Sequence, residues 1–203
     1  MNKAQKILWL FVAIAFLIFI AISLPTTKDN SLPEIMPVAG FNKGEHFILT
    51  SQDGKIYDSK SALKDGDYAL IFFGFTHCPV ICPTELQKMA VVMDMVPTEI
   101  QNKLQPLFIT IDPERDTMDI MQAYVPMFHE KIMGLTGDTK KIHKVLNDWK
   151  VYYTKVDDPQ FTEYTMDHST YSYLVDSDMN IKAIYRLQNT EGQIADSITK
   201  IVR

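Results

Sequence analysis

The stretch that decides the fold runs from residue 68 to residue 86 and reads Tyr68-Ala-Leu-Ile-Phe-Phe-Gly-Phe-Thr-His-Cys-Pro-Val-Ile-Cys-Pro-Thr-Glu-Leu86. Its first eight residues are almost continuously apolar, which is typical of a central strand buried on both faces of a parallel sheet. A helical pattern follows from Thr84 to about Met95, with apolar residues recurring along one stripe. The two cysteines, Cys78 and Cys82, therefore stand just past the carboxyl end of a strand, where open α/β sheets place their ligand sites.

Patterns on either side of this stretch predict the remaining elements. Further strands are expected over 46–50, 56–57, 107–111, 133–136, 151–156, 171–176 and 181–186. Further helices are expected from Asp116 or Thr117 to about Phe128, over 139–149 and over 191–203. The first two strands and the last two form hairpins, the first around an Asp53-Gly54 turn. The order predicts an α/β, thioredoxin-like fold: a central mixed sheet flanked by helices, with an extra N-terminal β-hairpin.

Residues 7–24 form an uninterrupted apolar run, ILWLFVAIAFLIFIAISL, of 18 residues without a charge. A transmembrane helix needs about 20 largely apolar residues. Lys3 and Lys6 precede the run, so the positive-inside rule places residues 1–6 in the cytoplasm and the rest of the chain outside it. The alternative is a cleaved signal peptide, with Ala21-Ile22-Ser23 as its cleavage site.

We therefore expect an N-terminal transmembrane helix over 7–24, a linker over 25–39 and one domain over 40–203. The expected location is the bacterial inner membrane, single-pass, with the C-terminal domain in the periplasm. The chain carries a formal charge of −5, and residues 1–24 contain two lysines and no acidic residue, so the remainder carries −7. Such an acidic domain argues against a nucleic-acid-binding protein.

Two cysteines separated by three residues suit only a few kinds of site. Pro83 disfavours helical backbone at the residue before it, so we expect Cys82 to be the N-cap residue of the helix, with Cys78 in the preceding loop. The positive end of the helix would then lower the pKa of Cys82. The pair can close a redox-active disulfide, chelate one soft metal ion or serve a purely structural role.

A copper site on two thiols usually needs a third ligand, and the sequence offers five histidines. His46, His129 and His143 fit a strand or solvated helix positions. His77 adjoins Cys78 and is expected to support the site rather than bind metal. His168 stands in a polar loop over 164–169, before a strand that closes the sheet. A set of two cysteines and one histidine suits Cu(I) and Cu(II), zinc accepts the same ligand types, and Met166 is a further sulfur nearby.

Three motifs in order resemble the SCO/SenC family: 74–86 around the cysteines, Ile109-Thr-Ile-Asp-Pro-Glu-Arg-Asp-Thr117, and Asp167-His-Ser169 before Tyr173-Leu-Val-Asp176. The resemblance spans roughly residues 40–203. It implies a membrane-anchored, thioredoxin-like copper protein that assembles the CuA centre of cytochrome c oxidase. Cys78, Cys82 and His168 match the family's copper ligands, and Asp167 would orient His168. Many members carry an acidic residue where this chain has Val80, which is expected to shift reduction potential or copper affinity.

The resemblance leaves two main functions open. The first is a copper chaperone that holds copper on Cys78, Cys82 and His168 and passes it to cytochrome c oxidase subunit II, after loading by a copper donor protein. The second is a thiol-disulfide oxidoreductase that uses Cys78 and Cys82 on exported partner proteins without copper delivery. Peroxide reduction is a weaker third possibility, because nothing in the sequence beyond the fold indicates an activated peroxidatic cysteine.

Overall fold

The computed structural model describes residues 2, 5, 9, 41–157 and 163–202. The expected membrane helix over 7–24, apart from Trp9, and the expected linker over 25–39 lie outside these residues. Within the described part of the chain, no helix combines the length and the apolar character needed to cross a bilayer.

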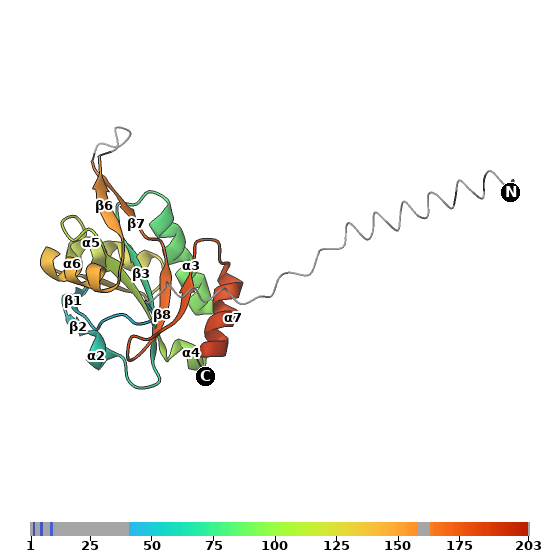
Figure 1. The fold of residues 1–203 in the computed structure, drawn as a ribbon, viewed down its shortest axis with the longest axis horizontal. Coiled ribbons are helices and arrows are strands. Elements are labelled where there is room, and N and C mark those ends of the chain that lie inside the picture. Colours follow the sequence, from blue (N-terminus) through green and yellow to red (C-terminus); the bar gives the residue numbers. More distant parts are fainter. Residues whose placement is uncertain (1, 3–4, 6–8, 10–40, 158–162, 203) are drawn as a thin grey trace. The chain divides into compact units, whose positions relative to one another are not determined.

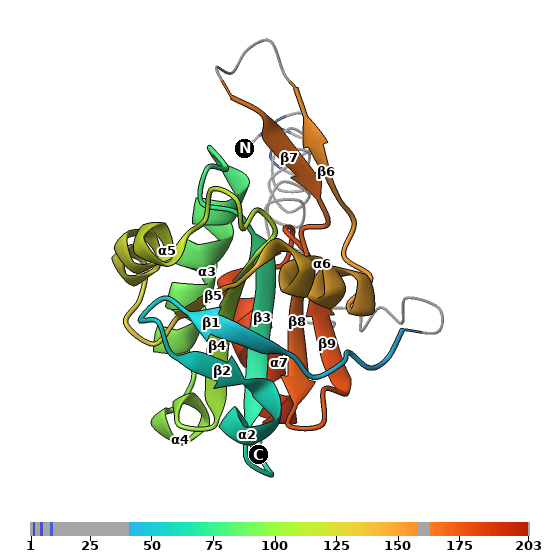
Figure 2. The same cartoon turned by 90° about the vertical axis from the view of Figure 1, so that its left-hand side faces the viewer.

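A seven-stranded mixed sheet forms the centre of the domain, in the order β2-β1-β5-β4-β3-β8-β9 (Figures 1 and 2). The strands of this sheet are β1 Ile48–Ser51, β2 Ile56–Asp58, β3 Tyr68–Gly74, β4 Leu104–Thr110, β5 Met133–Thr136, β8 Ser172–Asp176 and β9 Ile181–Tyr185. Strands β3, β4 and β5 are parallel, while the two hairpins, β1–β2 and β8–β9, add antiparallel strands at either edge. The sheet has the thioredoxin-like arrangement expected from the sequence, with the extra N-terminal hairpin.

Helices cover both faces of this sheet. They are α2 Ser59–Ala62, α3 Ile81–Met95, α4 Thr98–Gln101, α5 Met118–Tyr124, α6 Thr139–Asp148 and α7 Glu191–Ile201, with a 3-10 turn at Val125–Met127. Helices α3 and α7 lie side by side on one face, and α6 covers the other (Figures 1 and 2). Thr117 is the N-cap residue of α5 and accepts a hydrogen bond from the Ile120 amide. The predicted helix is thus confirmed, although it ends at Tyr124 and the 3-10 turn replaces its last turn.

Strand β3 is deeply buried, because every residue from Ala69 to Gly74 is shielded from solvent. The Phe73 ring lies 5.7 Å from the ring of Trp149, at the end of α6, and the Trp149 indole donates to the Glu45 carbonyl at 3.0 Å. Strand β3 pairs with β4 over its whole length, from Tyr68 opposite Leu104 to Gly74 opposite Thr110. Because β3 is buried on both faces of the sheet, its carboxyl end is held rigidly, and the loop with the cysteines begins from that end.

A second, separate sheet carries the expected third ligand. Among the described residues, strands β6 Tyr153–Val156 and β7 Thr165–His168 pair only with each other, with Tyr153 opposite His168 and Val156 opposite Thr165. The expectation of a polar loop over 164–169 was therefore wrong, because four of these residues form a strand. Figure 2 shows this β6–β7 hairpin extending past the end of the main sheet.

Candidate metal centre

The cysteines lie at the junction of β3 and α3. Strand β3 ends at Gly74, Cys78 lies in the connecting loop, and α3 begins at Ile81 with Val80 as its N-cap residue. Cys82 is therefore the second residue of the helix, and the prediction that it is the N-cap residue was wrong. Pro83 is the third helical residue, where its missing N–H costs no intrahelical hydrogen bond. The helix thus begins three residues before the predicted Thr84.

The pKa values of the two thiols are shifted in opposite directions. Cys78 is half-buried, and the hydrogen bond from the Cys82 thiol, with further bonds from the backbone N–H groups of Cys82, Val80 and Ile81, lowers the pKa of Cys78 to about 5. Cys82 is fully buried, and its pKa is raised because it donates to Cys78 and is desolvated. The prediction of a lowered pKa for Cys82 was therefore wrong: the positive helix end stabilises the Cys78 thiolate instead.

His168 lies at the end of β7 and faces the buried thiol. Its Nε2 is 3.7 Å from Cys82 Sγ. Its Nδ1 lies 2.8 Å from the Ser169 carbonyl oxygen, which only accepts, so Nδ1 carries the proton and Nε2 presents its lone pair. The ring packs against Phe72 and Phe75, with centroid distances of 6.4 and 5.9 Å. Burial lowers the pKa of His168, so its imidazole is neutral at physiological pH, as metal binding requires.

The three predicted ligands thus lie in a row, with Cys82 next to both Cys78 and His168. Both cysteines are free thiols, Cys78 Sγ accepts from the Cys82 amide at 3.4 Å, and Cys82 Sγ touches His168. In the described ranges, no three His, Cys, Asp or Glu side chains are already gathered closely enough to hold a metal ion. The donor chemistry, two sulfurs and one imidazole nitrogen on neighbouring residues, nevertheless fits a soft or borderline metal ion.

The residues expected to support the site have different surroundings. His77 is exposed, and its Nδ1 lies 3.1 Å from Thr76 Oγ1 and 3.7 Å from Asp116 Oδ1. Asp167 is exposed, and the hydrogen bond that orients His168 goes to the Ser169 carbonyl rather than to this carboxylate. Met166 is buried in the core, where its thioether serves as packing.

The other histidines lie in unrelated contacts. His46 Nδ1 lies 3.2 Å from Ser59 Oγ, and the His143 ring packs on Tyr153 with centroids 5.2 Å apart. His129 lies in the loop after the 3-10 turn rather than on a helix, and its Nδ1 accepts from the Lys131 amide. Val80, which lies between the two cysteines in the sequence, is 62% exposed, so its apolar side chain faces solvent.

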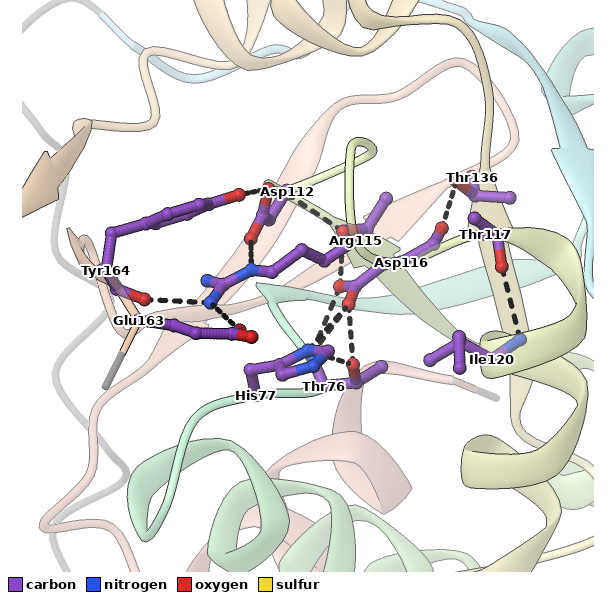
Figure 3. A network of polar contacts seen from close by, with 11 residues as sticks. Thr76, His77, Asp112, Arg115, Asp116, Thr117, Ile120, Thr136, Glu163 and Tyr164 are labelled. Carbon is purple, nitrogen blue, oxygen red and sulfur yellow. Dashed lines mark hydrogen bonds and ion pairs between the residues drawn. The ribbon is translucent and has the colours of Figure 1, made fainter. Parts of the chain in front are cut away.

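The turn over 112–117 holds the cysteine loop in place, as Figure 3 shows. Asp116 is completely buried, and its carboxylate accepts from the Thr76 amide at 3.1 Å, from Thr76 Oγ1 at 2.5 Å and from Thr110 Oγ1 at 2.6 Å. Burial raises the pKa of Asp116, while the hydrogen bonds from Thr110 and Thr76 oppose that shift. A buried carboxylate thus ties the start of the cysteine loop to strand β4.

The same turn also holds the β6–β7 hairpin. Arg115 Nε donates to Asp112 at 2.6 Å, Arg115 Nη1 donates to the Tyr164 carbonyl at 2.8 Å, and the Tyr164 hydroxyl donates to Asp112 at 2.8 Å (Figure 3). The sequence motif predicted only a turn and a capped helix here. The role of Arg115 was missed because its partner lies 49 residues further along the chain, and no local pattern reports that contact.

Comparison with known proteins identifies the family of this chain. The SCO1/SenC family model matches residues 37–203. The SCO2-like protein of Rickettsia felis is 40% identical over 161 residues, covering 75% of this chain and 74% of the relative. Protein SCO1 homolog 1, mitochondrial, of Arabidopsis thaliana is 37% identical over 160 residues, covering 79% of this chain. The chain spans only 47% of the length of that Arabidopsis relative.

A solved structure extends the likeness to three dimensions. The crystal structure of Arabidopsis thaliana ScoI with copper bound superposes with a TM-score of 0.70 at 37% identity, covering 77% of this chain and 96% of that one. The sequence match and the thioredoxin-like sheet agree. The chain belongs to the SCO1/SenC family.

Proposed function

We propose that this protein binds one copper ion through Cys78, Cys82 and His168, and that it delivers the ion to, or prepares the cysteines of, the CuA site of cytochrome c oxidase subunit II. The observation that carries the proposal is the 3.7 Å approach of His168 Nε2 to Cys82 Sγ, with Cys78 beside it. A neutral imidazole and a thiolate are ligands that copper accepts in both oxidation states. The copper-bound ScoI of Arabidopsis is a relative of known structure.

An anaerobic copper titration of the reduced domain tests the ligand set. The expected result is one copper per chain, with strong loss of affinity in Cys78→Ala, Cys82→Ala and His168→Ala. His46→Ala is the matched control, because His46 bonds to Ser59 in a separate contact, and its affinity is expected to equal that of the wild type. A His168→Ala variant with wild-type affinity would contradict the proposed ligand set. Delivery is tested separately, by mixing the copper-loaded protein with the reduced CuA domain of subunit II and following the CuA spectrum.

The adjacent free thiols favour a second candidate, reduction of a disulfide in an exported partner. The Cys78 thiolate attacks one partner sulfur, forming a mixed disulfide and releasing the other as a thiolate. The Cys82 thiol then loses its proton and attacks Cys78 Sγ, which closes the Cys78–Cys82 disulfide and releases the second partner thiol. Two electrons pass to the partner, and a dithiol reductant must restore the pair. Two results together would favour this candidate: the His168→Ala variant still reduces the partner disulfide, and the wild-type protein shows no copper affinity.

We also propose that the domain is held at the outer face of a bacterial inner membrane by residues 7–24, as the charge pattern around that run indicates. The full chain is expected in the membrane fraction, and a chain lacking residues 1–24 in the soluble fraction. Protease added to spheroplasts is expected to digest the domain, whereas protection from it would contradict the orientation.

A further inference from the structure

The hairpin that carries His168 is not part of the main sheet. In the described part of the chain, β6 and β7 bond to each other and not to any strand of the seven-stranded sheet. Two hydrogen bonds within the hairpin close its base. The Ser169 amide donates to the Tyr152 carbonyl at 3.0 Å, and the Tyr152 amide donates to Ser169 Oγ at 3.1 Å. Side-chain contacts must therefore fix the hairpin relative to the cysteines, and the packing of the His168 ring on Phe72 and Phe75 is one of them.

Polar contacts from the turn over 112–117 supply a second link. Besides its bond to the Tyr164 carbonyl, the Arg115 guanidinium lies over the Tyr164 ring, 3.7 Å from the ring centroid. Arg115 Nη2 is buried and has no hydrogen-bond partner among the described residues, and the guanidinium as a whole stacks on the ring. At the surface, Lys155 of β6 pairs with Glu114 at 2.6 Å.

The two halves of the site are joined within that turn. Thr110 Oγ1 accepts from the Asp112 amide at 2.9 Å and donates to Asp116 at 2.6 Å. Asp112 holds the hairpin through Arg115 and Tyr164, and Asp116 holds the cysteine loop through Thr76 (Figure 3). One continuous chain of hydrogen bonds, most of them made by a carboxylate or the guanidinium, thus runs from the loop that carries Cys78 to the hairpin that carries His168.

We propose that Arg115, acting with Asp112 and Tyr164, is a positioning residue that places the His168 imidazole against Cys82. This inference rests on the proposed function, because it concerns the third ligand of the copper site. The planar guanidinium suits this role because it bonds to a carboxylate and a carbonyl in fixed directions and stacks on an aromatic face, none of which an ammonium group reproduces. Arg115 itself does not touch the ion.

Two variants separate this role from general stabilisation. The Arg115 side chain is 14% exposed and that of Asp112 1%, so removing the charge altogether leaves a buried carboxylate unpaired and risks unfolding. Arg115→Lys keeps the charge and loses the fork and the stacking. Tyr164→Phe keeps the ring and removes only the hydroxyl bond to Asp112. Glu163→Gln is the matched control, since this exposed carboxylate approaches Arg115 Nη1 only to 3.6 Å.

The test measures Cu(II) affinity by chelator competition for each variant, in the wild-type and His168→Ala backgrounds. With His168 present, we expect a loss of about fivefold for Tyr164→Phe and a larger loss, of tens of fold, for Arg115→Lys, since each removes one or more directed contacts. Glu163→Gln is expected to have no effect. In the His168→Ala background, neither Tyr164→Phe nor Arg115→Lys should lower the affinity further. Tyr164→Phe and Arg115→Lys should weaken the nitrogen hyperfine structure of the Cu(II) EPR spectrum when His168 is present. In the His168→Ala background they should not change it.

Each other outcome has a defined meaning. Equal losses in both backgrounds indicate a general effect on the domain and overturn the positioning role, as does unchanged affinity in both variants. If Arg115→Lys fails to fold, Tyr164→Phe decides alone. If His168→Ala by itself leaves the affinity unchanged, the ligand set of the proposed function fails first, and the positioning role falls with it.

Discussion

Gly74 lies directly against Cys82: a Cβ built on Gly74 would stand 2.8 Å from Cys82 Sγ. The same Cβ would meet the rings of Phe108 and Phe72 at 2.9 and 3.0 Å. The last residue of β3 therefore has no side chain where the buried thiol needs room.

We expect Gly74→Ala to displace Cys82 Sγ away from its contact with His168. The free energy of unfolding should fall by about 1–3 kcal/mol, which is typical of overpacking in a core, and copper affinity should fall as well. Urea unfolding and copper titration measure the two effects. Gly192→Ala is the control, because its Cβ in α7 meets only Met95 Cε at an ordinary 3.9 Å. A Gly74→Ala variant with wild-type stability and affinity would show that the contact is unimportant.

The alkylation rate of Cys78 should report its lowered pKa. The thiolate is the reactive form, and the pKa of Cys78 is about 5. The iodoacetamide rate should therefore be level from pH 8 down to pH 6 and fall by about tenfold per unit below the pKa. In Cys82→Ala the midpoint should move upward, since the hydrogen bond from Cys82 is the largest cause of the shift. A wild-type rate that keeps rising between pH 7 and pH 9 would contradict this ionisation.

Asp116→Asn should loosen the cysteine loop. The carboxylate accepts from three donors, the Thr76 amide, the Thr76 hydroxyl and the Thr110 hydroxyl, and an amide has only one oxygen to offer them. With at least one buried donor left facing the new NH₂ group, the free energy of unfolding should fall by about 2–3 kcal/mol. Asp119→Asn, an exposed change in the first turn of α5, should alter it by less than about 0.5 kcal/mol. Equal stabilities of the two variants in urea would refute the role of Asp116.

Lys88→Met should destabilise the helix that carries Cys82. Lys88 and Glu85 form a buried pair at 2.6 Å, and Lys88 also donates to the Leu187 carbonyl at 2.8 Å. Loss of the lysine leaves Glu85 buried without its partner, at a cost of about 3–5 kcal/mol. The double variant Glu85→Gln with Lys88→Met should recover part of this loss. Lys144→Met, which breaks an exposed pair with Asp148, should cost less than about 1 kcal/mol by urea unfolding.

Much of the fold follows from local pattern. The apolar run of β3, the second run of β4 and the Asp53-Gly54 turn each predict their element without further information. Strand β7 does not, because four residues paired with one short partner strand leave too little alternation to recognise. For the candidate site, the order of the motifs is enough to name Cys78, Cys82 and His168 as candidates, but it does not predict the relative acidity of Cys78 and Cys82. Desolvation and a thiol-to-thiol hydrogen bond decide that acidity, and both depend on packing.

The separate β6–β7 sheet has a consequence for how such proteins diverge. Both cysteines lie directly after strand β3 of the seven-stranded sheet, whereas the His168 imidazole comes from a hairpin outside that sheet. On the proposed function, substitutions in the hairpin outside the buried Met166 should change metal retention while leaving abundance in the cell nearly unchanged, and substitutions in β3 should not. A variant library sorted once for expression and once for oxidase-dependent growth should give maps that agree over the core, Met166 included, and disagree over the other residues of 163–169.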